Sequence, residues 1–235
     1  LYESRDYAGA REKFAACKKA YETLDEIRGN YSVLAGFYEL ETCRKLEDLE
    51  GLKKLLDVYQ ADTLEREHQR NQLEVYPVWD AVRTKSWPRL DALVREVLAE
   101  KKWIGEHLAQ LKYCHGLALE GLGRDTDALI AFNGAFTADY TASEELTQKA
   151  ALACLRVIKG NDEVRLAIQL WGTEDEDPNS TGYFLLQEGV ALCGLWKKSL
   201  GGGQPLPAEF ASLLRYKEDN KPKPEAEEKA DEEGA

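Results

Sequence analysis

The chain has 235 residues, of which 43% are hydrophobic, enough to bury the core of one extended domain or two compact ones. Its 43 acidic residues outnumber the 31 basic ones, and the net charge of −12 repels nucleic-acid phosphates and anionic lipid surfaces. This composition argues against a chain that is disordered throughout and against nucleic acid as a partner.

No apolar run approaches the roughly 18 residues of a membrane span, and the N-terminus lacks the pattern of a signal peptide. The chain starts at Leu1 and contains no methionine, so we interpret it as a fragment that has lost any export signal, which leaves the compartment open. The odd number of dispersed cysteines favours a reducing, cytoplasmic setting over a disulfide framework or zinc site. These cysteines are Cys17, Cys43, Cys114, Cys154 and Cys193.

Helical periodicity begins close to the N-terminus. Tyr7, Ala10, Phe14 and Cys17 recur at spacings of three and four, which predicts a helix with one apolar side. Weaker patterns of the same kind follow in residues 49–59 and 87–97. We interpret them as degenerate copies of one helical unit.

The strongest pattern covers residues 103–138, as two helices separated by a short polar turn after Gly123. Helices joined by so short a turn should lie antiparallel and pack closely. Gly116, Ala128 and Ala135 then occupy positions where one helix backbone approaches another, and the large Leu122 and Phe132 fill the volume between them.

The rest of the chain continues as helices up to residue 216. Residues 141–144 (TASE) resemble a capping box before a helix, and further helices are expected in 164–171, 183–196 and 207–216. An acidic loop, TEDEDPNST, separates two of them. Residues 217–235 have too few large apolar side chains to offset their ordering entropy, so we expect a disordered acidic tail that solubilises the chain rather than tethering a partner.

A family resemblance rests on the strongest pattern. With Ala109 as the first position of a 34-residue unit, seven residues fall on the signature positions of the tetratricopeptide repeat, which the unit therefore resembles. They are Gly116, Leu119, Leu122, Gly123, Ala128, Phe132 and Ala135. The unit departs from the family pattern at Lys112, His115 and Tyr140. The resemblance implies one all-α domain over residues 1–216, an α-solenoid of antiparallel helix hairpins wound into a right-handed superhelix with a concave groove.

In this family the first helix of each pair lines the groove, so the resemblance also implies which side chains would face a peptide. Carried onto this sequence, these residues are Phe37, Glu41, Arg44, Gln72, Val75, Trp79, Arg83, Gln110, Tyr113, Leu117 and Glu120. Each unit offers one aromatic side chain among polar ones, as peptide recognition requires. The alternative is that Phe37, Trp79 and Tyr113 pack against adjacent helices. The family's carboxylate clamp needs Lys and Asn, which are absent from the corresponding positions.

Residues suited to catalysis or to metal and cofactor binding are scarce. The three histidines form no metal-ligand spacing, and His115 lies on an apolar helix face, as a hydrogen-bonded core histidine does. The acidic loop has oxygen ligands at alternating positions but lacks the glycine and glutamate of a calcium loop. We therefore expect no enzyme activity and no cofactor. The main hypothesis is a scaffold that binds a protein or peptide, and the alternative is a sensor with an enclosed small-molecule pocket.

Overall fold

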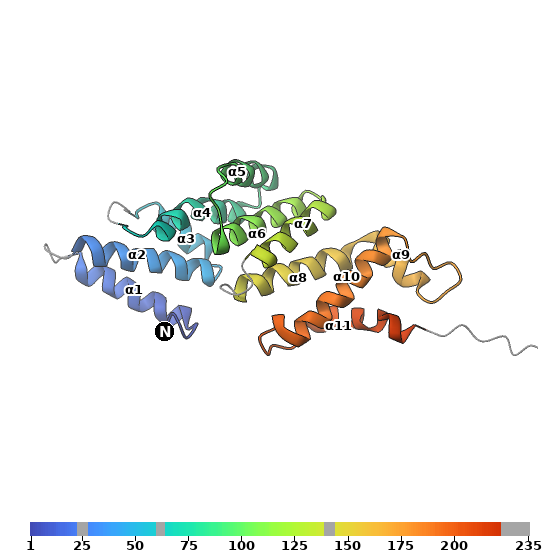
Figure 1. Cartoon of the computed structure of the whole chain (residues 1–235). Coiled ribbons are helices and arrows are strands. Elements are labelled where there is room, and N and C mark those ends of the chain that lie inside the picture. The colour runs from blue at the N-terminus through green and yellow to red at the C-terminus, as the bar shows by residue number, and fades with distance from the viewer. Residues whose placement is uncertain (23–27, 60–63, 139–143, 222–235) are drawn as a thin grey trace, which may run out of the picture. The chain divides into compact units, whose positions relative to one another are not determined.

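The computed structural model describes residues 1–22, 28–59, 64–138 and 144–221, which form helices and turns without a strand. Helices that follow each other in the sequence pack together in pairs (Figure 1), so the predicted all-α helical-repeat fold is confirmed. The chain divides into two compact units, Leu1–Arg124 and Asp125–Ala235, where the sequence suggested one continuous domain. We call them unit 1 and unit 2.

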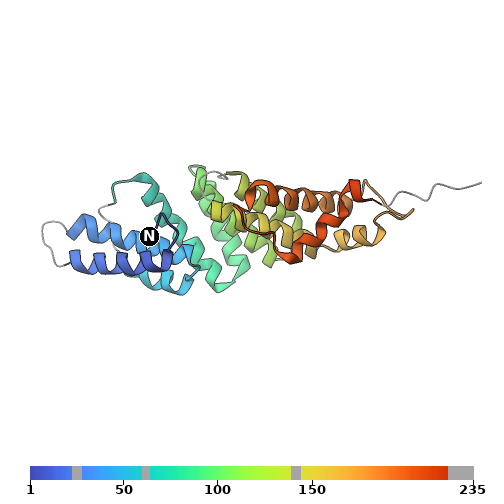
Figure 2. The same cartoon turned by 90° about the horizontal axis from the view of Figure 1, so that it is seen from below.

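The described part of unit 1 forms six helices. They are α1 (Tyr7–Tyr21), α2 (Arg28–Lys45), α3 (Leu49–Leu56), α4 (Glu67–Thr84), α5 (Trp87–Ala99) and α6 (Gly105–Gly121). Helix α1 lies along α2 in both Figure 1 and Figure 2. Helix α3 contacts α2 and α4, and α6 packs against both α4 and α5.

One carboxylate both starts a helix of unit 1 and ties two helices together. Asp48 caps α3 by accepting a hydrogen bond from the Gly51 amide at 2.8 Å, and it forms an ion pair with Arg11 of α1 at 2.6 Å. The Gly51 hydrogen bond and then Arg11 lower the pKa of Asp48. These contacts therefore stabilise the fold above the unfolded-state pKa of the carboxyl group, and that stabilisation is lost as the pH falls through the folded-state value.

The described part of unit 2 forms four longer helices followed by shorter helical segments. The elements are α7 (Asp125–Ala138), α8 (Glu144–Gly160), α9 (Asp162–Leu170), α10 (Thr181–Leu195), the π-helical η1 (Trp196–Leu200), α11 (Ala208–Ala211) and the 3-10 turns η2 (Ser212–Tyr216) and η3 (Glu218–Asn220). Helix α7 pairs with α8 and α9 pairs with α10, while η2 folds back onto α10.

The predicted elements correspond to these helices with a few differences. The hairpin expected after Gly123 would join α6 of unit 1 to α7 of unit 2, so its packing stays a prediction. The expected capping residues 141–143 and residues 222–235 of the expected tail lie outside the described residues. Residues 217–221 were also assigned to the tail, but they form η3 and a contact with α9 and α10 that is described below.

The pairing of α9 with α10 requires a residue without a side chain at Gly182. A Cβ atom there would overlap the backbone carbonyl of Glu163 in the first turn of α9. Backbone atoms cannot move aside as a flexible side chain can. Gly182 therefore allows the two helices to approach more closely than any other residue would.

We predict that Gly182→Ala lowers the free energy of unfolding by about 1–3 kcal/mol, because the new methyl group forces α9 and α10 apart. Gly194→Ala in the same helix is the matched control, since a Cβ at Gly194 meets no atom within 4 Å. The control should gain about 0.5–1 kcal/mol from its lower backbone entropy. Urea denaturation followed by circular dichroism measures both, and equal stabilities of the two variants would contradict the prediction.

Candidate functional site

The eleven predicted groove residues lie on α2, α4 and α6 of unit 1, but the structure buries most of them. Seven side chains are buried, namely Phe37, Glu41, Arg44, Gln72, Val75, Trp79 and Gln110. The remaining four, Arg83, Tyr113, Leu117 and Glu120, are half-buried. The polar members of the buried group contact one another, and they form two connected clusters.

The first cluster is centred on a buried arginine. Arg44, whose side chain is 3% exposed, donates from Nε to both carboxylate oxygens of Glu41 at 3.0 Å. The Tyr76 hydroxyl of α4 donates to the same carboxylate at 3.0 Å. Arg44 also reaches Glu106 of α6 at 3.2 Å. One guanidinium group thus connects three helices through charge-assisted hydrogen bonds.

Arg44 and Tyr76 each keep a single protonation state in this cluster. Burial by itself lowers the pKa of Arg44, but the adjacent Glu41 carboxylate outweighs burial and raises it above the ordinary value. Burial, followed by the charge of Glu41, raises the pKa of Tyr76 well above its usual range. The arginine therefore stays charged and the tyrosine stays neutral, which suits a permanent structural contact better than proton transfer.

The second cluster joins α4 to α6 through side-chain amides. Gln72 and Gln110 donate to each other at 2.9 and 2.8 Å, and the Trp79 indole donates to the Gln110 oxygen at 2.8 Å. The guanidinium carbon of Arg44 lies 5.8 Å from the centre of the Trp79 ring, within the range of a cation–π contact. The centres of the Trp79 and Tyr113 rings are 6.0 Å apart. The two clusters are therefore continuous.

These contacts favour the packing alternative for two of the three aromatic residues. Phe37 and Trp79 are 5% and 4% exposed, whereas Tyr113 is half-buried. Arg83 does not join the clusters and instead pairs with Asp80 and Glu50. Five of the eleven side chains assigned to a peptide hydrogen-bond to one another and seven are buried, so any ligand on this face would have to use the half-buried residues.

Burial and hydrogen bonding set the environments of several reactive side chains. Burial raises the pKa of the Cys43 and Cys193 thiols to about 11 and that of Cys154 to about 12, so these thiols are protonated near neutral pH. His115 lies 2.9 Å from Asp91, in agreement with the expected hydrogen-bonded histidine. Among the described residues, no group of His, Cys, Asp and Glu side chains could hold a metal ion.

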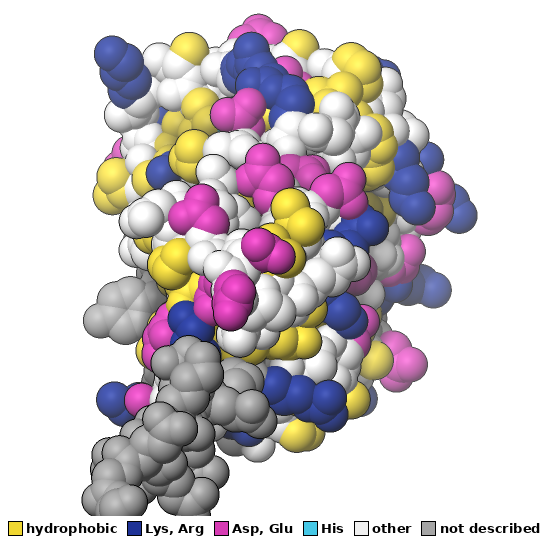
Figure 3. All heavy atoms as spheres, turned by 90° about the vertical axis from the view of Figure 1, so that its right-hand side faces the viewer, with side chains coloured by type: hydrophobic (Ala, Val, Ile, Leu, Met, Phe, Trp, Pro, Cys, Tyr) yellow, Lys and Arg dark blue, Asp and Glu magenta, His cyan; other side chains and the backbone are white. Residues whose placement is uncertain are grey.

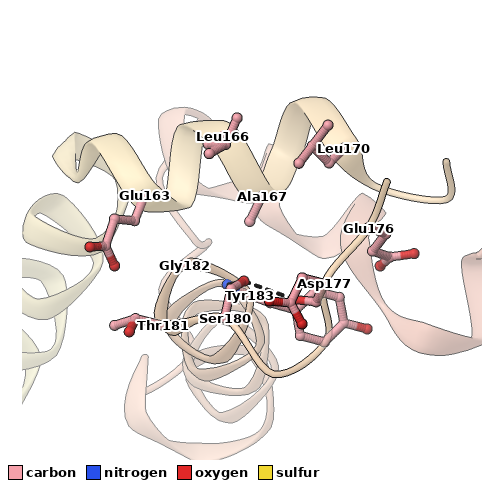
Figure 4. Close-up of a pocket in the computed structure, with 10 residues that line it drawn as sticks. All are labelled: Glu163, Leu166, Ala167, Leu170, Glu176, Asp177, Ser180, Thr181, Gly182 and Tyr183. Atoms are coloured by element: carbon pink, nitrogen blue, oxygen red, sulfur yellow. Dashed lines mark hydrogen bonds between the residues drawn. The ribbon is translucent and has the colours of Figure 1, made fainter. Parts of the chain in front are cut away.

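Unit 2 contains a cleft that sequence reasoning did not identify, between α9, the acidic loop and the start of α10 (Figure 4). We call it the α9–α10 cleft. Its volume is about 390 Å³, and Ala167 points from α9 toward the first residues of α10. Leu166 and Leu170 provide further apolar surface, while Glu163, Glu176 and Asp177 provide carboxylates. The cleft is therefore apolar with acidic edges.

A second cleft of about 400 Å³ lies between α7, α8 and α10, and we call it the α7–α8–α10 cleft. Its residues include Leu129, Ile158, Leu192 and the exposed Leu195, with Glu188 as the charged residue. The end of unit 2 that carries α9 and the acidic loop shows acidic side chains with apolar ones between them (Figure 3). Both clefts thus combine apolar surface with negative charge.

Comparison with protein-family models, with curated proteins and with solved structures finds no match to this chain. None of the helices in the described part of the chain has the length and apolar character needed to cross a bilayer. The resemblance to tetratricopeptide repeats stays a prediction based on the seven signature residues.

Several residues of these sites carried no sequence signal. Tyr76 and Glu106 belong to no motif, and their role depends on the contact between α2, α4 and α6. The sequence identified the acidic loop that contains Glu176 by its charge. Trp171 and Tyr183, which flank this loop, were predicted only as residues of helix faces. Spacing in the sequence could not bring these residues together.

We predict that Glu41→Gln lowers the free energy of unfolding by about 3–5 kcal/mol, because it removes the main charge that compensates buried Arg44. Glu50→Gln removes one of the two partners of half-buried Arg83, which keeps its contact with Asp80, so the free energy of unfolding should change much less. Thermal and urea unfolding of the two variants provide the measurement. A loss for Glu41→Gln no larger than for its control would mean that the Arg44 cluster does not hold the helices together.

Proposed function

We propose that the chain is a non-catalytic, tetratricopeptide-like scaffold that binds a protein or peptide through exposed apolar surface of unit 2. This is the function predicted from the sequence. The sequence placed the binding surface on α2, α4 and α6, whereas we now propose that it lies on α10. The reason is that most of the groove residues of unit 1 are buried and their buried polar members hydrogen-bond to one another, whereas α10 presents apolar side chains to solvent.

The observation that carries this proposal is the exposed side of α10. This helix, TGYFLLQEGVALCGL, is apolar around most of its circumference, which is typical of a helix covered on all sides. Nevertheless Phe184 is 61% exposed and Leu195 is 41% exposed, and Ala191 lies on the same side. We call these three residues the α10 face. Large exposed apolar side chains beside a cleft mark a docking surface, and burying each gains up to about 2–3 kcal/mol.

The non-catalytic part of the proposal is supported by the states of the titratable groups. The buried arginine, tyrosine and glutamate of unit 1 satisfy one another, and burial raises the pKa of the Cys43, Cys154 and Cys193 thiols so that they stay protonated. A small-molecule sensor would need an enclosed pocket. Both clefts of unit 2 are bordered by exposed side chains, such as Leu166 and Leu195, which suits a docked segment better than an enclosed ligand.

We predict that the double substitution Phe184→Ser and Leu195→Ser lowers the amount of a specific partner captured from a lysate of the source cells about tenfold or more, because it removes the apolar area that the partner would bury. Quantitative mass spectrometry of the captured proteins gives the measurement. Circular dichroism should first show that the variant remains as helical as the wild-type chain.

The matched control is Val58→Ser and Ile104→Ser, which removes two apolar side chains of unit 1 that are 70% and 77% exposed. This control tests whether any loss of exposed apolar surface lowers capture. Equal capture by the wild-type chain and the α10-face variant, or an equal loss in the control, would rule out the α10 face as the docking surface.

A further inference from the structure

A lysine ammonium group is bound at the corner where α9 leads into the acidic loop. Lys221, the last described residue, places its Nζ 5.4 Å from the ring centre of Trp171 and 5.6 Å from that of Tyr183. The two rings stack with centres 5.6 Å apart. The same Nζ lies 2.8 Å from the Glu176 carboxylate. A cation beside two aromatic rings and a carboxylate is a recurrent way to recognise lysine.

The carboxylate of this site has binding capacity that the chain does not use. The Glu176 side chain is only 7% exposed. One of its oxygens accepts from the Gly172 amide at 3.1 Å and from Lys221, but the other oxygen is buried and has no hydrogen-bond partner among the described residues. A buried carboxylate oxygen without a partner is costly, and it is usually explained by a function or a missing ligand.

Lys221 is held by a segment with few contacts. Residues 217–220 are exposed, and the single turn η3 precedes the lysine. The Tyr183 hydroxyl donates to Glu218, Gln187 donates to the Tyr216 carbonyl at 3.0 Å, and Tyr216 packs edge-on against Trp171. A short exposed segment of this kind opens at small free-energy cost compared with the helical core. The occupant of the site can therefore be exchanged.

The site is continuous with the α9–α10 cleft, because Glu176 and Tyr183 belong to both. The cleft offers Leu166, Ala167 and Leu170 to an apolar side chain, and the carboxylates of Glu163 and Asp177 stand at its exposed edge. This combination is complementary to a segment that carries an apolar residue next to a lysine.

We propose that Trp171, Tyr183 and Glu176 form a lysine-recognition site which Lys221 occupies in cis, and that a partner peptide with a lysine next to an apolar residue displaces it. This inference rests on the proposed scaffold function and specifies the chemistry of its partner. The chain's own C-terminal segment then acts as a competitor that weakens binding until it is displaced.

The experiment compares two synthetic peptides, Ac-Ala-Leu-Ala-Lys-Ala-NH2 and the same peptide with norleucine in place of lysine. Binding to the full chain is followed by the NMR signal of the Trp171 indole N–H, assigned with Trp171→Phe. On the Lys221→Gln variant, the lysine peptide should bind about tenfold more tightly than the norleucine peptide. It should also bind about tenfold more tightly to Lys221→Gln than to the wild-type chain, because the competitor has been removed.

Glu176→Gln, added to Lys221→Gln, should abolish the preference for lysine, whereas Glu163→Gln at the cleft edge should largely retain it. The comparison of two peptides on one protein does not depend on the stability of any variant. Equal affinity for both peptides on Lys221→Gln, or no binding by either at millimolar concentration, would overturn the proposal. So would a lysine-peptide affinity that is unchanged by Lys221→Gln.

The capture experiment separates this inference from the scaffold proposal. If the α10-face substitutions lower capture but neither peptide binds, the scaffold proposal is retained and the lysine-recognition site is excluded. Selective binding of the lysine peptide with no effect of the α10-face substitutions would retain the lysine site and exclude α10 as the docking surface.

Discussion

The arrangement of unit 1 depends on one buried charge. Arg44 lies almost wholly out of solvent, and a guanidinium group in that position is tolerated only when its charge and its donors are compensated. Glu41 supplies most of this compensation from the same helix, and Glu106 adds to it from α6. Tyr76 satisfies a further lone pair of Glu41. The geometry is therefore determined by directional bonds in addition to apolar packing.

This constraint explains why most of the side chains that the family resemblance assigned to a ligand are buried. Glu41, Arg44, Gln72 and Gln110 are polar, as recognition would require, but their hydrogen-bonding groups are used within α2 and between α2, α4 and α6. Breaking them to admit a ligand would leave buried donors and acceptors unpaired. Unit 2 differs in two ways. Helix α10 exposes apolar side chains, and one carboxylate oxygen of Glu176 accepts no hydrogen bond from the described residues.

The recognition sites proposed above lie in unit 2, whereas the buried charge cluster lies in unit 1, a division that composition alone did not reveal. Unit 1 pairs its internal charges, while unit 2 carries the acidic loop, the two clefts and the aromatic corner at Trp171. The net charge of −12 agrees with recognition of a positively charged segment and adds long-range attraction to it. The lysine that already lies at the aromatic corner is a local example of such recognition.

The sequence by itself determined that the chain is helical and where most helices lie, because helix formation follows from apolar residues at local spacings of three and four. Ala10, Leu52, Leu90 and Ala128 were expected on apolar faces, and all four are buried.

Tertiary structure alone decided which polar side chains became internal. Arg44 and Arg83 are both arginines on expected first helices, yet one is buried and the other pairs near the surface. Lys221 looked like part of a disordered tail because its neighbours are polar, but its contacts with Trp171 and Glu176 come from residues far away in the sequence. Such contacts depend on how helices pack, and local periodicity does not encode that packing.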